Sequence, residues 1–260
     1  MVDAVELATT LRELHHADEP LLLPNVWDAA SAKAAERAGF PALATTSMSV
    51  ALTLGYADHE AAPADEMFAA VGRIARAVSV PVTADIEAGY GLAPEEVVDR
   101  LLSAGAVGCN LEDTDHGGVG LVEPAKQADR LAAVRAAADA AGVPIVINAR
   151  ADSFVPSHEV EDRLGDALNR GRAYLDAGAD AVYPIFAAAE SDISALVTGL
   201  EAPVNIAYIP AGLPLPATPG LAGLANLGVR RVSFGGGLHA ATEQALHRVL
   251  TAIRQGENPY

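Results

Sequence analysis

The sequence predicts an α/β protein folded as a closed (β/α)8 barrel, also called a TIM barrel. Short apolar, β-branched segments recur along the whole chain, and an alanine-rich stretch that suits a helix follows each of them. Strands of a parallel sheet are buried on both faces, so nearly continuous apolar runs favour parallel strands. We expect eight strands, at Leu21–Asn25, Ala42–Ser47, Pro81–Ile86, Val107–Glu112, Pro144–Ala149, Asp180–Ile185, Pro203–Ala207 and Arg230–Phe234.

The residues that lead into these strands form an internal repeat. From the second strand to the eighth, glycine and proline alternate in chain order: Gly39, Pro81, Gly105, Pro144, Gly178, Pro203 and Gly228. A glycine after a helix takes the left-handed conformation that ends it, and a proline stops a helix and starts an extended chain. This repeat favours a closed barrel over an open doubly wound sheet, which expects fewer strands and a glycine-rich phosphate-binding turn.

The segments between the strands carry helix signals. In Pro94–Ala104 the proline suits the first helical position, Glu95 and Glu96 fall in the first turn, and Gly105 follows the end. Asp28 precedes an alanine-rich run and is expected to cap the first of these helices. No linker or change of composition divides the chain, so we expect one barrel domain over residues 1–260.

Composition and charge exclude several classes of protein. Hydrophobic residues make up 51% of the 260 and charged residues 20%, which excludes intrinsic disorder. Seventeen basic against thirty-four acidic residues give a net charge of −17, which disfavours nucleic-acid and membrane-surface partners. The acidic start of the chain is unlike a signal peptide, and no apolar run is long enough to span a bilayer. A cytoplasmic protein is therefore expected.

Acidic residues gather where the predicted strands end, which is the face where barrels of this kind carry their chemistry. Asp85 and Glu87 are two apart, so on an extended segment both would point to the same side, and Glu112 ends the next strand. With Asp58 as a fourth member, these carboxylates would repel one another unless a cation joined them. All-oxygen ligation favours Mg²⁺ or Mn²⁺, with one direct carboxylate and the others holding waters. The alternative is that these acids cap helices or pair with surface bases.

Two further features of this face suit an anion. Arg150 ends an otherwise apolar strand, where its guanidinium suits bidentate binding of a carboxylate or phosphate; the alternative is a salt bridge to a nearby acid. The hydroxyl and main-chain N–H groups of Thr45–Met48 form a second candidate cradle. Cys109 falls inside the fourth strand and is expected in the core, while His116 lies close enough to the acids to take part.

Five motifs occur in order between residues 20 and 240: Pro24–Ala32, Thr46–Ser47 with the later Asp58, Asp85–Gly91, Leu111–Asp113 and Asn148–Asp152. Together they resemble the isocitrate lyase/phosphoenolpyruvate mutase superfamily. The resemblance implies a barrel whose last helix is swapped between partners in a homodimer or homotetramer. It also implies Mg²⁺ near Asp85, reached by Asp58, Glu87 and Glu112 mainly through water. The carboxylate of a 2-oxo or enol acid would be held by Thr45, Ser47, the Met48 amide and Arg150, with Asn205 facing the substrate.

Four departures from the family pattern bear on the reaction. The loop over residues 116–126 has no cysteine, whereas isocitrate and methylisocitrate lyases carry a Lys-Lys-Cys-Gly-His loop there. That loop has only one lysine, Lys126, which also disfavours phosphorus–carbon chemistry. Met48 stands where the family usually has glycine, and Asn148 where many members have a small or apolar residue.

The parts that remain predict a Mg²⁺-dependent carbon–carbon lyase or decarboxylase that acts on a small 2-oxo or 2-hydroxy acid through an enolate. Arg150, Glu112 and His116 are the candidates for direct participation. The donor of the final proton stays open among His116, Tyr90 and a metal-bound water. The alternatives are a phosphonate mutase or phosphorus–carbon hydrolase, and a non-catalytic binder of 2-oxo acids.

Overall fold

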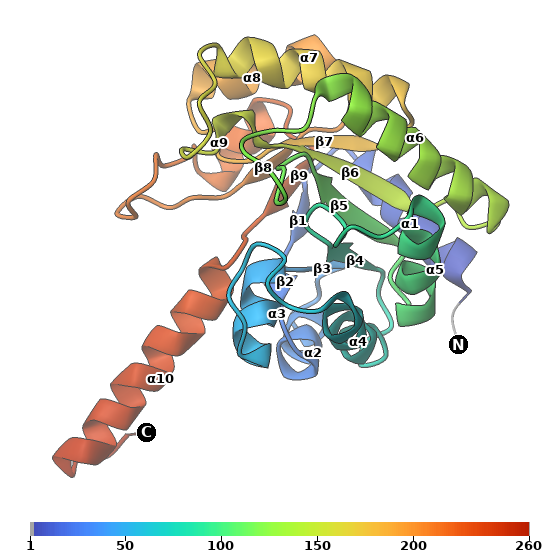
Figure 1. The fold of residues 1–260 in the computed structure, drawn as a ribbon. Coiled ribbons are helices and arrows are strands. Elements are labelled where there is room, and N and C mark those ends of the chain that lie inside the picture. Colours follow the sequence, from blue (N-terminus) through green and yellow to red (C-terminus); the bar gives the residue numbers. More distant parts are fainter. Residues whose placement is uncertain (1–2, 260) are drawn as a thin grey trace.

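The computed structural model describes residues 3–259, and its strands form a ring surrounded by helices (Figure 1). All eight predicted strand positions are confirmed, and the first holds two short strands. The strands are β1 (Leu21–Leu23), β2 (Asn25–Val26), β3 (Leu43–Thr45), β4 (Val82–Asp85), β5 (Gly108–Glu112), β6 (Val146–Ala151), β7 (Ala181–Pro184), β8 (Asn205–Ala207) and β9 (Arg231–Ser233).

The ring closes through parallel pairing all the way round. Six strands pair in the order β2-β3-β4-β5-β6-β7, and three in the order β1-β9-β8. Strands β1 and β2 are joined by Pro24 alone, and a parallel bridge between Val182 and Val204 links β7 to β8. With β1 and β2 counted as one position, which pairs with β9 and β3, each of the eight strand positions has two neighbours. This is the closed barrel predicted from the sequence, and it excludes an open sheet.

Helices α2 to α9 lie outside the ring in chain order, and α1 lies against the end of the barrel where the strands begin (Figure 1). They are α1 (Ala4–His15), α2 (Ala29–Arg37), α3 (Ser47–Leu54), α4 (Ala64–Ala75), α5 (Pro94–Ala104), α6 (Pro124–Ala140), α7 (Arg163–Asp176), α8 (Glu190–Leu200), α9 (Leu221–Asn226) and α10 (Gly237–Gln255), with a short 3-10 turn, η1 (Asp152–Phe154). Helix α5 has the predicted bounds, and Gly105 ends it with a φ of 84°, a conformation that favours glycine. Asp28 caps α2 by accepting from the Ser31 backbone N–H at 2.7 Å.

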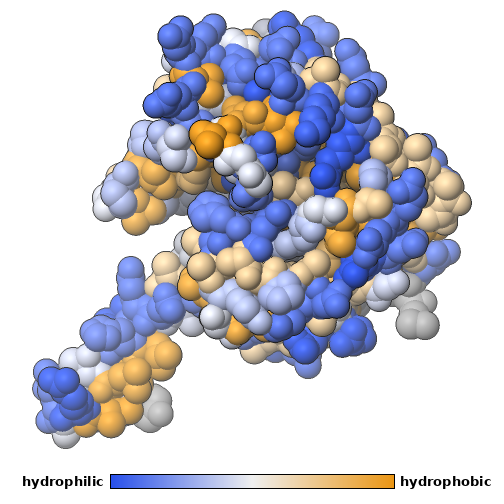
Figure 2. All heavy atoms as spheres, viewed as in Figure 1, coloured by the Kyte–Doolittle hydropathy of each residue, from blue (hydrophilic) through white to orange (hydrophobic). Residues whose placement is uncertain are grey.

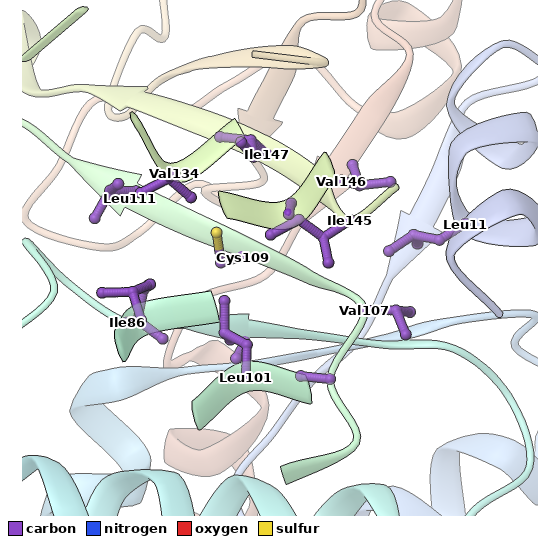
Figure 3. Close-up of a cluster of buried hydrophobic side chains, with 14 of the residues drawn as sticks. Leu11, Ile86, Leu101, Val107, Cys109, Leu111, Val134, Ile145, Val146 and Ile147 are labelled. Carbon is purple, nitrogen blue, oxygen red and sulfur yellow. The ribbon is translucent and has the colours of Figure 1, made fainter. Parts of the chain in front are cut away.

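The largest hydrophobic cluster packs strands β4 to β6 against the helices outside them. Figure 3 shows Cys109 of β5 between Leu101 of α5 and Ile147 of β6. Cys109 is fully buried, as predicted, and burial raises the pKa of its thiol to about 12, so it stays protonated at neutral pH. This apolar packing fixes the strands whose far ends carry the polar residues described below.

Helix α10 differs from every other helix because it extends away from the ring (Figure 1). None of its residues is buried. Leu246, Leu250 and Ile253 are each more than half exposed, and Figure 2 shows an apolar strip along the helix. No helix within residues 3–259 is long and apolar enough to cross a membrane.

Candidate active site

The polar residues predicted to form a site come together at the carboxyl ends of β3 to β6. Asp85 ends β4, Glu112 ends β5 and Arg150 lies near the end of β6. In the parallel register Glu112 lies beside Arg150. This end of the barrel interior is called the mouth below, and it brings three of the predicted residues from three different strands into one place.

Asp85 is oriented by two hydroxyl-bearing residues of the preceding strand and helix. The backbone N–H and the hydroxyl of Ser47 donate to Asp85 Oδ2 at 3.1 and 2.9 Å, and the Asp85 N–H donates to Thr45 Oγ1 at 2.9 Å. Thr45 and Ser47, expected to hold the substrate, thus hold Asp85 in this structure. The second carboxylate oxygen, Oδ1, is buried and has no hydrogen-bond partner.

The prediction that Glu87 continues the extended strand of Asp85 is wrong, although the Glu87 carboxylate does lie at the mouth. Strand β4 ends at Asp85, and Glu87 has a φ of 50° in a turn closed by a 2.8 Å bond from the Gly89 N–H to the Ile86 carbonyl. The chain turns instead of staying extended. Burial, together with the charges of Asp85, Asp58 and Glu112, raises the pKa of Glu87 to about 7.

A loop that the sequence did not single out holds the Glu87 carboxylate. The backbone N–H of Glu60 donates to Glu87 Oε2 at 2.7 Å, and the Tyr90 hydroxyl donates to Oε1 at 3.0 Å. The Glu60 carboxylate accepts in return from the Tyr90 N–H at 2.6 Å. His59, Glu60, Glu87 and Tyr90 all have a φ between 50° and 67°, which costs energy in residues other than glycine. Strained backbone is therefore concentrated around this carboxylate.

Glu112 links a histidine to an arginine across the mouth. His116 Nε2 lies 2.7 Å from Glu112 Oε1, and Arg150 Nη1 forms an ion pair with Glu112 Oε2. Burial raises the pKa of Glu112 to about 7, against the lowering effect of Arg150 and His116. The hydrogen bond to Glu112 raises the pKa of His116 above its ordinary value. His116 therefore belongs to the site by contact as well as by position.

Arg150 forms a two-point contact with Asp152, an acid to which the sequence analysis gave no role in the site. Its Nε and Nη2 donate to the two oxygens of Asp152 at 2.7 and 2.9 Å. Burial opposes the charge of Arg150, but Asp152 and Glu112 raise its pKa well above the usual range. The salt-bridge alternative for Arg150 is thus confirmed, and it leaves an anion-binding role open.

Behind this two-point contact lies a second buried ion pair. The Asp152 N–H donates to Asp113 Oδ1 at 2.9 Å, and Arg170 of α7 lies 3.1 Å from Asp113 Oδ2. The hydroxyl of Tyr174, one turn further along α7, also donates to Asp113 Oδ2. These contacts join residues 39 to 61 positions apart in the sequence, where no local pattern marks them.

Two other predicted residues have different surroundings. Asn205 is fully buried inside the barrel, where its Oδ1 accepts from the Ser233 hydroxyl at 3.2 Å and its Nδ2 has no partner. Met48, in the first turn of α3, is 38% exposed, and its side chain lies over Gly236. A Cβ atom at Gly236 would lie 2.0 Å from Met48 Cε, so a side chain there would require Met48 to change rotamer.

The predicted metal ligands fit a cation bound through few direct contacts. Within residues 3–259 no three His, Cys, Asp or Glu side chains stand close enough together to hold a metal ion directly. Asp85 Oδ1 is nevertheless a buried acceptor without a donor, and burial raises the pKa of Glu87 and Glu112, so a cation beside them would stabilise their charged forms. Asp58 is half-buried and adds to this negative field. One direct carboxylate with the others reached through water suits this arrangement.

A cavity of about 450 Å³ adjoins the mouth. His116 and Glu60 line it together with Lys126, Gln127 and Arg130. Neither Asp85 nor Arg150 lines it, so the cavity is a space beside the mouth and does not contain these two residues. It brings the side chains of Lys126 and Arg130, at the start of α6, towards the mouth.

The fold and the mouth define a class of protein: a parallel (β/α)8 barrel with carboxylates and one arginine at the carboxyl ends of adjacent strands. A family model described as phosphoenolpyruvate phosphomutase matches residues 11–254. The chain therefore belongs to this family, within the isocitrate lyase/phosphoenolpyruvate mutase superfamily, whose members include lyases, decarboxylases and mutases of small carboxylic acids. The resemblance stated from the sequence motifs is confirmed.

Individual relatives share most of the chain. An uncharacterized protein of Mycobacterium tuberculosis is 30% identical over 248 residues, which cover 95% of this chain and 90% of that protein. An oxaloacetate decarboxylase of Rhodopseudomonas palustris is 29% identical over 246 residues, 90% of this chain and 81% of the relative. A crystal structure from Burkholderia cenocepacia J2315 with a provisional phosphonomutase name has a TM-score of 0.87 at 40% identity, covering 95% of this chain and 99% of that one.

Proposed function

We propose that the protein is a carbon–carbon bond lyase or decarboxylase that depends on Mg²⁺ or Mn²⁺ and acts on a small 2-oxo or 2-hydroxy carboxylic acid through an enolate. The observation that carries the proposal is the buried, unpartnered Oδ1 of Asp85 beside an excess of carboxylates and the positive Arg150. Such an arrangement supplies a site for a cation and, next to it, one for an anion. The relationship to an oxaloacetate decarboxylase supports the same class of substrate.

In this proposal Asp85 holds the cation directly, and Asp58, Glu87 and Glu112 hold its waters. A divalent cation bound there would polarise the 2-oxo group of the substrate as a Lewis acid. Ser47 fixes the carboxylate of Asp85 through two hydrogen bonds, so Oδ1 stays aimed away from them. The residues thus prepare one free oxygen at a fixed place before any ligand arrives.

Arg150 would bind the substrate carboxylate, and Asp152 would orient it for that task. The two-point contact with Asp152 uses Nε and Nη2, and Glu112 takes Nη1. Thr45, Ser47, the Met48 amide and Asn205 remain candidates for further substrate contacts. A guanidinium held on two sides has little freedom left, so binding a carboxylate costs little further side-chain entropy.

For the proton that ends the reaction we favour His116 over Tyr90. Its ring contacts Glu112, whose other oxygen contacts Arg150, so it lies one side chain from the proposed anion. The Tyr90 hydroxyl instead donates to Glu87. With a substrate whose C3 carries an alkyl group, His116→Gln should form product in deuterated water that is deuterated without stereochemical preference at C3, whereas Tyr90→Phe should keep the preference. The reverse result would assign the proton to Tyr90.

A substrate screen tests the reaction class. The protein with Mg²⁺ is incubated with small 2-oxo, 2-hydroxy and phosphono acids, and products are identified by carbon and phosphorus NMR. Cleavage or decarboxylation that is abolished by chelation and by Asp85→Ala supports the proposal. A phosphorus signal that changes with phosphonopyruvate would favour a phosphonate enzyme. Thermal stabilisation by a 2-oxo acid without turnover would favour a binder.

We further propose that residues 1–260 form one domain and that α10 docks on a second copy of the chain. Its exposed leucines and isoleucine form an apolar strip with nothing of its own chain against it (Figure 2). Reciprocal exchange of this helix would bury the strip in a homodimer or homotetramer. Light scattering should then give a multiple of the chain mass, and Leu246→Glu with Leu250→Glu should give a monomer. A monomeric wild type would refute the exchange.

A further inference from the structure

The barrel interior below the mouth holds a guanidinium that the proposed reaction does not use. Arg231 lies on β9, between β1 and β8, and has no exposed surface. It is the largest of the fully buried side chains within the described residues. Its neighbour Arg230 faces outward and donates to the carbonyls of Ala17 and Asp18 at 2.9 and 2.8 Å. Of two adjacent arginines, one therefore ties down a surface loop and the other enters the barrel.

Neutral groups surround the Arg231 guanidinium. Its Nη2 donates to Asn110 Oδ1 at 2.9 Å, Nη1 lies 3.3 Å from His15 Nε2, and Nε has no hydrogen-bond partner. His15 Nδ1 lies 2.7 Å from the Leu11 carbonyl and must donate there, which leaves Nε2 as an acceptor. Burial and the charge of Arg231 lower the pKa of His15 to about 3, so this histidine is neutral.

No carboxylate within residues 3–259 forms an ion pair with Arg231. Burial lowers the pKa of Arg231 to about 10, so the group is still charged at neutral pH. The groups that stabilise its charge are Tyr183, Asp85 and Cys109. Burial raises the pKa of both Tyr183 and Cys109, which makes them neutral at pH 7. Asp85 is thus the charged member of the three, and it lies beside Asn110, the residue that accepts from Arg231, in the register of β4 and β5.

The same guanidinium also supports the two strands that carry Glu112 and Arg150. Asn110 Oδ1, which accepts from Arg231, accepts from Asn148 Nδ2 as well, at 2.8 Å. Glu112 follows Asn110 by two residues on β5, and Arg150 follows Asn148 by two on β6, so in each pair both side chains face the barrel interior. One buried cation therefore connects β9, β5 and β6 directly beneath the mouth.

We propose that Arg231 is a positioning residue of the candidate site, a fixed positive charge below Asp85 that strengthens binding of the anionic substrate and weakens binding of the cation. This inference rests on the proposed function, because it assumes that the mouth takes one cation and one anion. A charge in a dry interior is little screened, so it acts over several ångströms without touching either ligand. An unpaired buried cation lowers the stability of the fold. Under the site, however, the same charge can change how strongly the ligands bind.

The proposed role of Arg231 is tested by whether its removal strengthens or weakens the binding of Mn²⁺ and of oxalate. Mn²⁺ binding is measured by the loss of its free electron paramagnetic signal, and oxalate binding by calorimetry at saturating Mn²⁺. Replacing the charge by Arg231→Met should tighten Mn²⁺ and weaken oxalate, each by about tenfold, the size of a partly screened charge interaction. Arg231→Lys, which keeps the charge, should change both by less than about threefold.

The opposite signs separate electrostatics from structure. A merely structural role would weaken both ligands in Arg231→Met, and equal affinities would show no role, so either result overturns the inference while the proposed function stands. If Arg231→Met does not fold, Arg231→Gln is neutral, can still donate to Asn110, and should show the same pair of shifts. Arg135→Met removes an arginine that is ion-paired to Asp180, and should leave both affinities unchanged. A wild type that binds no Mn²⁺ would refute the proposed function and this inference with it.

Discussion

The two ends of the barrel interior handle charge in opposite ways. At the mouth, acids outnumber bases: Glu87 and Glu112 are buried, and Arg150 contacts two carboxylates at once. The region beneath the mouth, around Arg231, is called the floor. There Arg231 contacts Asn110 and the neutral His15, and no acid forms an ion pair with it within the described residues. The mouth has a deficit of positive charge, and the floor has a positive charge without a partner.

This difference teaches where a ligand is needed. At the floor, the positive charge of Arg231 is held by neutral groups and has no contact with solvent. At the mouth, burial raises the pKa of Glu87 and Glu112, so the negative charge of these two acids is not fully compensated. A ligand of positive charge would complete the mouth, whereas the floor needs none. Mutations at the two ends should therefore change different measured quantities.

The largest expected effect concerns Arg150 at the mouth. Arg150→Lys keeps a positive charge but loses the two-point contact with Asp152, so kcat/KM for the substrate found by screening should fall by about 10²–10³, as when a precisely placed donor is lost. Arg135→Lys, in α6 beside the start of β6, should change kcat/KM by less than about twofold. Equal effects in the two variants would show that the position of Arg150 at the mouth has no special role.

The next effect is on stability and concerns the ion pair behind the mouth. Asp113 is fully buried, so Asp113→Asn would leave Arg170 without its buried counter-charge and should lower the free energy of unfolding by about 3–5 kcal/mol. Urea unfolding measures this change. Asp166→Asn removes the other partner of Arg170, a carboxylate that is 26% exposed, and should cost about 1 kcal/mol or less. A similar loss in both variants would argue against a special role for the buried pair.

The floor should make stability depend on pH through His15. Its pKa is about 3 when folded and 6.5 when unfolded, so below pH 6.5 the unfolded chain binds the proton first. Stability from this group is complete above pH 6.5 and falls by about 1.4 kcal/mol per pH unit towards pH 3. His15→Gln can still accept from Arg231 and should have a shallower decline between pH 6.5 and 4.5 in urea unfolding. Parallel curves for the two proteins would contradict the neutral state of His15.

The smallest expected effect is on stability and concerns Asp28, an acid near the mouth whose role is to cap helix α2. Asp28 accepts from the Ser31 N–H, and Ser31 completes a reciprocal capping box. Asp28→Ala should lower the free energy of unfolding by about 1 kcal/mol, while Asp28→Ser keeps most of the cap. Neither variant should alter kcat/KM. A large loss of activity in Asp28→Ala would extend the site to this residue.

Apolar runs and their lead-in residues were enough to predict the barrel. All eight strand positions were correct, but β6 begins two residues later than predicted, because Pro144 lacks an N–H group and cannot join the ladder through its nitrogen. The division of the first strand around Pro24 has the same origin. Period-two reasoning failed at Glu87, where the chain had already left the strand and entered a left-handed turn.

The site was predictable where it depends on strand ends and was missed where it depends on helices. Asp85, Glu112, His116 and Arg150 follow directly from barrel geometry. Arg170 of α7 contacts Asp113 behind the mouth, and Glu60 reaches the mouth from a loop. Nothing in their local sequence shows which way they face. Arg231 stood inside a predicted strand, but two adjacent arginines do not reveal which one points inward until the register is known.

Met48 and Gly236 lie about 190 positions apart in the chain, yet a change at one requires movement at the other. A Cβ atom at residue 236 would lie 2.0 Å from Cε of Met48, which is the far end of a flexible side chain that is 38% exposed. A side chain introduced at residue 236 would therefore be accommodated when Met48 changes rotamer, without movement of the backbone. One mobile side chain thus couples the first turn of α3 to the start of α10.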